Sequence, residues 1–145
     1  MTYLIDDFSV STTMHQLTYP VGSVVAVADG GVFPFSVISG DSGLSVTTGV
    51  ITLTQGEYYA IAQFAETNGL ETLMKMCING TALDDKFSQP ARIASTSSAT
   101  SSNVTSMSVF RAQDGDLLSI QNFSGDTRSF YVGLTDLVLL RRGNR

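Results

Sequence analysis

Apolar and polar residues alternate along most of the chain with the two-residue period of a strand. In the segment 57–64, EYYAIAQF, this alternation places Tyr58, Ala60, Ala62 and Phe64 on one side. Turn signals rich in glycine separate such segments at intervals of about ten residues, which is typical of short antiparallel strands. The pattern therefore predicts an all-β chain folded as a sandwich or a barrel.

One segment, 66–76 (ETNGLETLMKM), also has apolar residues at helical spacing. Asn68-Gly69 within it is a turn signal, however, and LMKMCING fits a strand that ends at Asn79-Gly80. We therefore expect a strand here. The hydroxyl-rich segment 95–106 is expected to be an exposed loop or an edge strand rather than a linker between domains.

Two strands carry apolar residues on both faces, although a two-layer sandwich needs only one apolar face per strand. The second face is covered either by another copy or host surface, or by the protein's own N-terminal segment. Large exposed apolar patches are uncommon on monomers, so we favour self-association or docking. The candidate interface residues on these second faces are Tyr59, Ile61, Tyr131, Leu137 and Leu139.

The length and charge of the chain limit the possible functions. Its 145 residues fit one domain, and the formal net charge of −5 argues against a nucleic-acid binder, which needs a basic face. No apolar run is long enough to span a membrane, and the N-terminus lacks the features of a secretion signal. We expect neither a nucleic acid nor a membrane as partner.

Few residues are available for catalysis or metal binding. His15 and Cys77 are the only histidine and cysteine, which excludes a zinc site built from these ligands, and Cys77 is expected to be buried. Asp114 and Asp116 flank Gly115, but a calcium loop needs six to eight oxygen ligands. We interpret this pair as a turn that leads into a strand, although cation binding by the pair stays open. The sequence predicts no enzymatic activity, metal or cofactor.

The C-terminal third resembles the jelly roll of the tumour-necrosis-factor and complement C1q superfamily. The resemblance rests on Gly115-Asp116, the loop 123–128, and the final strand FYVGLTDLVLL, together with the earlier Gly56-x-Tyr58. It implies an antiparallel jelly-roll β-sandwich in a single domain, 19–145. It also implies self-association, because the family packs three protomers about an axis through these strands; a dimer stays an alternative to a trimer.

Departures from the animal members of this family direct the functional prediction. The sequence has no collagen-like stalk, secretion signal or cysteine pair. Similar small jelly rolls serve as bacteriophage cement or decoration proteins, so we expect a subunit made in the host cytoplasm that binds the major capsid protein, or another virion protein, on the particle's exterior. The alternative is a receptor- or glycan-binding tip of a head or tail fibre. Residues 1–18 are expected to form an arm across a neighbouring subunit, through Tyr3, Leu4 and Phe8.

Overall fold

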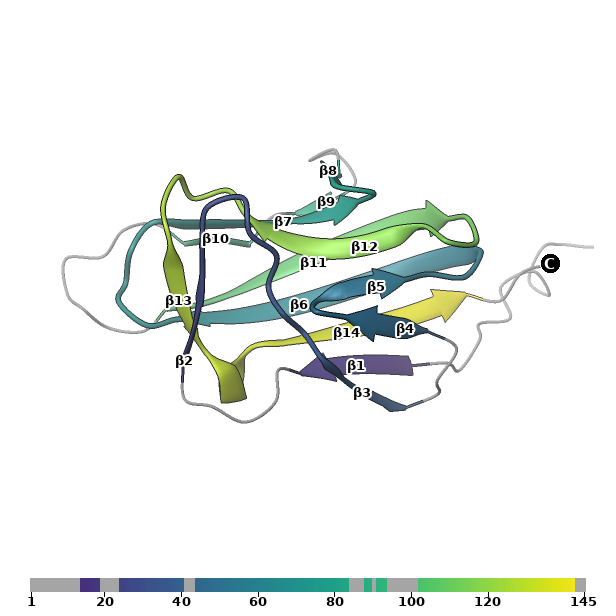
Figure 1. Ribbon diagram of the computed structural model, residues 1–145, viewed down its shortest axis with the longest axis horizontal. Helices are drawn as coiled ribbons and strands as arrows, with labels where there is room; N and C mark the ends of the chain where they lie inside the picture. Colours follow the sequence, from purple (N-terminus) through teal and green to yellow (C-terminus); the bar gives the residue numbers. More distant parts are fainter. Residues whose placement is uncertain are drawn as a thin grey trace, which may run out of the picture.

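Two antiparallel sheets pack face to face in the computed structural model, which describes residues 14–18, 24–40, 44–83, 88–89, 91–93 and 102–142 (Figure 1). Sheet A consists of β1 (Met14–Thr18), β2 (Val24–Val27), β3 (Val37–Gly40), β6 (Gly56–Glu66), β9 (Ser88–Gln89), β11 (Ser102–Ala112), β13 (Arg128–Tyr131) and β14 (Asp136–Arg142). Sheet B consists of β4 (Ser45–Thr47), β5 (Val50–Thr52), β7 (Thr72–Ile78), β8 (Thr81–Ala82), β10 (Ala91–Ile93) and β12 (Leu117–Asn122). The predicted antiparallel β-sandwich is confirmed.

The long strand β6 organises sheet A. Strand β11 pairs with the whole length of one of its edges. Its other edge is shared by β14 and, at Glu66, by β13. Between β13 and β14 lies a single 3-10 turn, η2 (Val132–Leu134), so the last strand of the sheet is interrupted rather than continuous. This interruption decides which side chains of β14 face the core.

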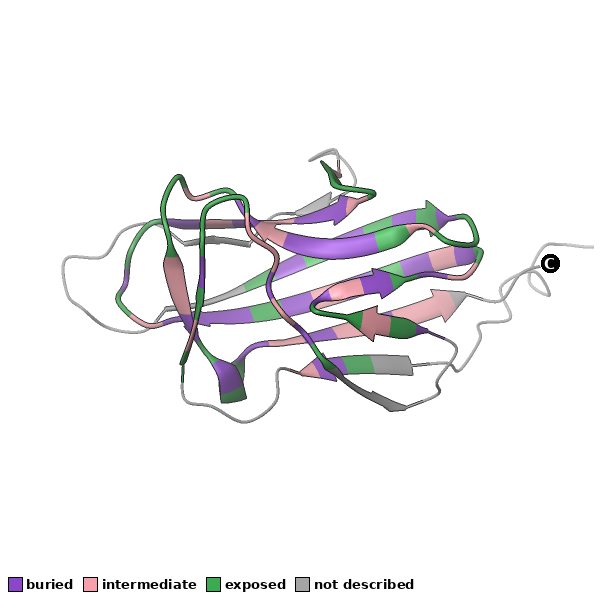
Figure 2. Ribbon diagram, viewed as in Figure 1, coloured by how far each residue is buried: buried purple, intermediate pink, exposed green. Residues whose placement is uncertain are grey.

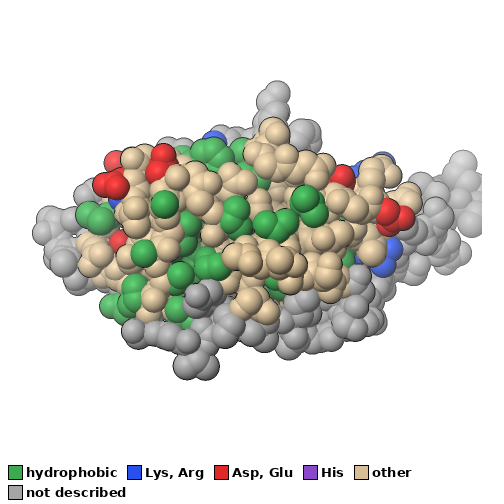
Figure 3. All heavy atoms as spheres, in the orientation of Figure 1, with side chains coloured by type: hydrophobic (Ala, Val, Ile, Leu, Met, Phe, Trp, Pro, Cys, Tyr) green, Lys and Arg blue, Asp and Glu red, His purple; other side chains and the backbone are tan. Residues whose placement is uncertain are grey.

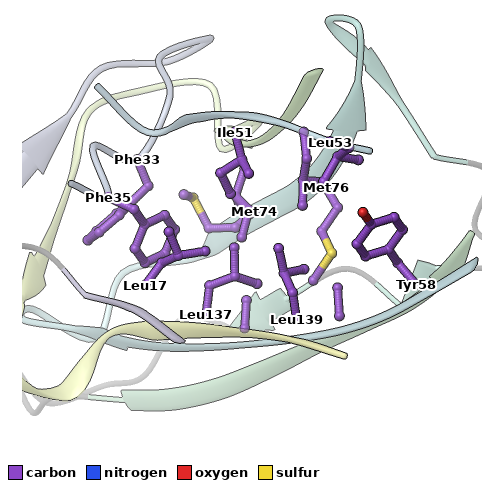
Figure 4. Close-up of a cluster of buried hydrophobic side chains, with 14 of the residues drawn as sticks. Leu17, Phe33, Phe35, Ile51, Leu53, Tyr58, Met74, Met76, Leu137 and Leu139 are labelled. Carbon is purple, nitrogen blue, oxygen red and sulfur yellow. The ribbon is translucent and has the colours of Figure 1, made fainter. Parts of the chain in front are cut away.

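The core lies between the inner faces of the two sheets (Figure 4). Sheet A contributes Tyr58, Leu137 and Leu139 from β6 and β14, and sheet B contributes Met74 and Met76 from β7. All of these side chains are almost or completely inaccessible to solvent. Burial of this kind stabilises the fold by about 1.5–3 kcal/mol for each large apolar side chain.

Four phenylalanine rings occupy one end of the core. The ring of Phe33 lies 5.8 Å from the rings of both Phe64 and Phe130, each time in an edge-to-face arrangement. Phe35 lies 4.6 Å from Phe33, measured between ring centroids. Aromatic pairs favour such offset and edge-to-face geometries, so the cluster joins the segment around Phe33 to both β6 and β13.

The turn between β4 and β5 requires glycine at position 49. Thr48 and Gly49 both have positive φ angles, of 48° and 81°, as the central residues of tight hairpin turns do. A Cβ atom on Gly49 would lie 2.0 Å from the carbonyl oxygen of Phe33. The Gly49 N–H instead donates a hydrogen bond to the Phe35 carbonyl at 2.8 Å. The hairpin is therefore held against the segment that carries the phenylalanine cluster.

Several predicted elements can be compared with the structure. The strand expected within the segment 66–80 is β7, which ends at the turn of Asn79 and Gly80, so the strand interpretation is confirmed. Residues 14–18 of the predicted N-terminal arm are a sheet strand, β1, which lies between β14 and β3. The rest of the predicted arm, including Tyr3, Leu4 and Phe8, lies outside the described residues. So does most of the hydroxyl-rich segment, of which residues 102–106 belong to β11.

Candidate functional site

The outer face of sheet A carries a continuous set of apolar side chains. Burial alternates along β6, so that its even-numbered residues up to Phe64 face the core and its odd-numbered residues face outward (Figure 2). The same alternation holds along β11 and β14. We call the outward apolar residues of these three neighbouring strands the outer apolar patch. They are Tyr59, Ile61, Met107, Val109, Val138 and Leu140.

The strand register arranges this patch in two rows. Tyr59 is the register partner of Val109 on one side and of Leu140 on the other. Ile61 is likewise the partner of Met107 and Val138. Directly opposed side chains on adjacent strands are in contact distance of each other, so each row crosses three strands without a gap.

The outer apolar patch is open to solvent in the single chain. Val109 is 57% exposed, Met107 40% and Tyr59 38%. The Tyr59 hydroxyl donates a hydrogen bond to the Met107 sulfur at 3.4 Å. This weak contact fixes the ring along the face and leaves the apolar surface uncovered.

One end of the outer apolar patch is bordered by an ion pair. Glu57 and Arg111 are register partners on β6 and β11, next to the row of Tyr59. The Arg111 Nε and Nη2 atoms lie 2.9 Å and 2.7 Å from the Glu57 Oε1 atom. Exposed pairs of this kind contribute only about 0–1 kcal/mol to stability, and less in salt. The pair marks a polar edge of the patch rather than an anion or cation site.

The other end of the patch is bordered by a polar row. It contains Thr105, Gln63, Asp136 and Thr18, which are register neighbours across β11, β6, β14 and β1. Asp136 is the only charged side chain in this row. Burial raises the pKa of its carboxyl group above the ordinary value of 3.8.

Beyond the polar row lies a second, smaller group of exposed apolar residues: Val24, Tyr131 and Leu134. Tyr131 and Val24 are register partners on β13 and β2, and Leu134 lies in η2. The neighbour Phe130 is completely buried, so Tyr131 points away from the core. The outer face of sheet A therefore has two apolar groups separated by one polar row.

The outer face of sheet B differs from that of sheet A. Figure 3 shows this side, with small groups of apolar side chains among polar atoms and charged side chains toward the two ends. Its exposed apolar residues include Leu117 and Phe123, and the Lys75 ammonium lies 5.6 Å from the centre of the Phe123 ring. Scattered apolar residues of this kind are normal on a protein surface.

Comparison with solved structures identifies the architecture. Over 92% of this chain and 94% of the other, the fold superimposes on the tumour-necrosis-factor protein Eiger from S. frugiperda with a TM-score of 0.66 and 14% sequence identity. Murine APRIL at pH 5.0 gives a TM-score of 0.64 at 15% identity, covering 89% of this chain and 98% of APRIL. The globular domain of the zebrafish complement 1qA protein gives 0.61 at 14% identity, covering 91% and 100%. The fold is a TNF/C1q-type jelly roll.

The similarity is one of fold, since the sequence identities are low. No protein-family model matches this sequence, and no curated protein matches it either. The resemblance that the sequence motifs indicated is thus confirmed for the jelly-roll architecture. What the chain binds has to be argued from its own surface.

The structure places the predicted interface residues in three different environments. Tyr59 and Ile61 lie together in the outer apolar patch. Tyr131 lies in the second, smaller group of exposed apolar residues, beyond the polar row. Leu137 and Leu139 were expected on the outer face, but both are completely buried in the core (Figure 4). Their expected facing is wrong because η2 interrupts the strand after Tyr131 and shifts the alternation by one residue.

Sequence reasoning missed part of the outer apolar patch: Met107, Val109, Val138 and Leu140. A signal was present in β11, where Ser106 and Ser108 alternate with Met107 and Val109. The serines face inward and are buried beside Ala60 and Ala62 of β6, while the larger apolar residues face outward. This apolar-out pattern in β11 is the signal from which the outer apolar patch could have been found.

The carboxylates of Asp114 and Asp116 accept hydrogen bonds from backbone and side-chain N–H groups around their turn. The Gln55 N–H donates to the Asp114 carboxylate at 2.6 Å. The Gln113 N–H and the Asn79 side-chain amide donate to Asp116 at 2.8 Å and 3.0 Å. These bonds, that of Gln113 above all, hold the pKa of Asp116 below its ordinary value. The interpretation as a turn that leads into β12 is confirmed.

The remaining chemically reactive groups are single residues. Cys77 is buried in β7, and burial raises the pKa of its thiol above the ordinary value. Glu66 is also buried, and its Oε2 atom accepts hydrogen bonds from the N–H groups of Asn68 and Leu70. Within the described ranges, no three side chains of the metal-ligating types come together, and no helix is long and apolar enough to cross a membrane.

Proposed function

We propose that this protein is a structural or binding module that works as a homo-oligomer, most simply a trimer, with the outer face of sheet A buried between copies. One observation carries the proposal: the outer apolar patch crosses three adjacent strands and is open to solvent in the single chain. Self-association removes this surface from water, which stabilises the assembly by about 25 cal/mol for each Å² of apolar surface buried.

The area that a stable interface needs favours burial of more than the outer apolar patch alone. A stable interface between proteins buries about 800 Å² on each partner. Contact that extends from the outer apolar patch across the polar row to Tyr131 and Leu134 uses most of the outer face of sheet A. The jelly-roll fold supports this choice of face, because the superfamily resemblance implies protomer packing through these strands.

The proposed role needs no catalytic group, metal or cofactor, and we propose that the protein is not an enzyme. Its specific form is a decoration subunit on the exterior of a virus particle, which stabilises the shell by binding a capsid protein only after assembly. The test of this specific role is co-sedimentation of the purified protein with expanded capsids. Equal binding to unassembled capsid protein, or no binding to capsids, contradicts it.

Self-association itself is tested by sedimentation velocity on the purified chain. Met107→Asp places a carboxylate in the outer apolar patch and is expected to shift the protein to monomers. Leu117→Asp is the matched control, because Leu117 is also 40% exposed but lies on β12 of sheet B. The proposal is contradicted if the unaltered chain is a stable, well-folded monomer at micromolar concentration, or if both variants associate as the unaltered chain does.

A further inference from the structure

Asp136 occupies an unusual position on the outer face of sheet A. On one side of it lie Val138 and Ile61 of the outer apolar patch, and on the other lie Tyr131 and Leu134. A copy that covers both apolar groups must also cover the carboxylate between them. The position is therefore inside the proposed interface, although the residue itself is charged.

The surroundings of Asp136 supply no positive charge. Its register partners are Gln63 on β6 and Thr18 on β1, both uncharged. The neighbouring positions on the same side of β6 are Ile61 and the completely buried Ala65, both apolar. Tyr131 on β13 presents an exposed phenol ring. In the part of the chain that the structure describes, its carboxylate makes no ion pair or hydrogen bond with another side chain.

Among the described side chains of sheet A, the arginines of β13 and β14 bond elsewhere: Arg128 donates to the Glu71 carbonyl and Arg141 to the Gln55 carbonyl. The one histidine, His15, is on β1 as the register partner of Leu139, three residues along β14 from Asp136. Glu57 and Arg111 lie six residues further along β6 and its partner strand, about 20 Å away at about 3.3 Å per residue. This separation exceeds the screening length of about 8 Å at physiological salt. Glu66 is three residues along β6 from Gln63, but it is buried and bonded to the turn at Asn68 and Leu70.

We propose that Asp136 makes self-association through sheet A dependent on pH, with copies binding more tightly in mildly acidic than in neutral solution. This inference rests on the proposed self-association and concerns its regulation by pH. Covering the outer face takes the carboxylate out of water, and its own neighbours Gln63 and Thr18 supply no cation. The neutral, protonated acid can be buried at lower cost than the ionised form.

The direction of the effect follows from proton linkage. Partial burial already raises the pKa of Asp136 in the single chain, and covering it with another copy raises the pKa further. A group whose pKa is higher in the associated state takes up protons on association. The stabilisation is therefore complete below the pKa of the free chain, and it is lost as the pH rises through the pKa of the assembly.

Symmetry amplifies the effect, because each copy contributes its own Asp136. Between the two pKa values, one carboxylate changes the association constant by about tenfold per pH unit, and three change it by up to about a thousandfold. We expect association of the unaltered chain to be at least about tenfold tighter near pH 5.5 than near pH 7.5.

The test is sedimentation equilibrium of the full chain at these two pH values, with Asp136→Asn beside it. The asparagine keeps the shape of the side chain but cannot titrate, so this variant is expected to associate equally well at both pH values. It is also expected to associate more tightly than the unaltered chain at neutral pH. Glu71→Gln is the matched control, because it removes the same charge from a different part of the surface. Glu71 is exposed in the connection between β6 and β7.

The control is needed because the sequence pI of about 4.5 makes any association stronger on acidification. Glu71→Gln should therefore keep the full pH dependence, which Asp136→Asn loses. The inference is overturned if Asp136→Asn keeps the pH dependence of the unaltered chain, or if the unaltered chain associates equally at both pH values. Monomers of all three proteins at every pH would instead refute the proposed self-association itself.

Discussion

The Asp114 carboxylate accepts a hydrogen bond from the Gln55 N–H at 2.6 Å, across 59 residues of sequence. The same turn is bonded to the neighbouring segment through the backbone, since the Gly115 N–H donates to the Leu53 carbonyl at 3.0 Å. The turn before β12 is thus tied to the segment that leads into β6. Each of these two segments connects one sheet to the other, from β5 to β6 and from β11 to β12, so the bonds hold two crossings together at one end of the sandwich.

Asp114→Ala is therefore expected to lower the free energy of unfolding by about 1 kcal/mol, the typical net contribution of one hydrogen bond. Asp126→Ala serves as control, because the Asp126 carboxylate accepts only the N–H of its neighbour Thr127. Urea titrations of the two variants measure the difference. Equal stability of the variants would show that the Asp114 bond contributes nothing to holding the two connecting segments together.

Asp116 gives this turn a pH dependence of its own. Its pKa is held below the ordinary value of 3.8 by the bond from the Gln113 N–H and by the bond from Asn79. A lowered pKa in the folded state stabilises the fold above the ordinary value, and this stabilisation is lost as the pH falls through the lowered pKa.

The corresponding variant is Asp116→Asn, compared with the unaltered chain at about pH 6 and about pH 3. We expect the variant to be less stable at the higher pH and the difference to shrink on acidification. Comparing the two proteins at each pH removes contributions from other carboxyl groups, including that of Asp136. A difference that stays constant with pH would contradict the assigned role of the ionised carboxylate.

Gly49 and Gly80 separate two effects of a side chain at a positive φ. Both have a φ angle of 81°, but a Cβ atom would meet the Phe33 carbonyl at position 49 and no atom within 4 Å at position 80. Gly80→Ala is expected to cost only the backbone strain, about 1–2 kcal/mol. Gly49→Ala adds a steric clash with backbone and is expected to cost more than about 3 kcal/mol, or to prevent folding.

Thermal unfolding of the two glycine variants, followed by circular dichroism, measures this comparison. The conformational term is the same in both variants, so their difference reports the close contact between the hairpin turn and the segment around Phe33. Similar melting temperatures would mean that the hairpin can move away from Phe33 at little cost.

Local pattern was sufficient to predict strands and turns, but not the side that each strand presents to the core. Segments 55–64 and 114–123 show the limit, because both have an isoleucine four residues after an acid. Ile61 lies on the outer face of sheet A, whereas Ile120 is completely buried. The facing depends on how each strand enters its sheet, which the residues within the strand do not encode.

The same reasoning explains which of the candidate residues face outward and which do not. Tyr59 and Ile61 were placed correctly on the outer face because β6 is uninterrupted and its alternation is regular. Strict alternation from Tyr131 failed for Leu137 and Leu139, since nothing in the sequence VGL marks η2 as a 3-10 turn. The register pairs of Tyr59 with Val109 and Leu140 required knowledge of which strands are neighbours.

Leu139 and Leu140 provide the sharpest test of the observed facing, because they are consecutive leucines with opposite environments. Leu139 is completely buried between the sheets, and Leu140 lies partly exposed in the outer apolar patch. Leu139→Ala leaves a cavity in the core and is expected to lower the free energy of unfolding by about 2–5 kcal/mol. Leu140→Ala is expected to cost much less in the single chain but to weaken self-association.

The two effects are separated by their dependence on protein concentration. The stability of an oligomer rises with protein concentration, so the melting temperature of the unaltered chain should be higher in more concentrated solutions. Leu139→Ala should lower the melting temperature by a similar amount at every concentration. Leu140→Ala should lower the melting temperature mainly at concentrations where the unaltered chain is assembled. If Leu140→Ala instead had the effect expected of Leu139→Ala, and the other way round, β14 would present its other side to the core.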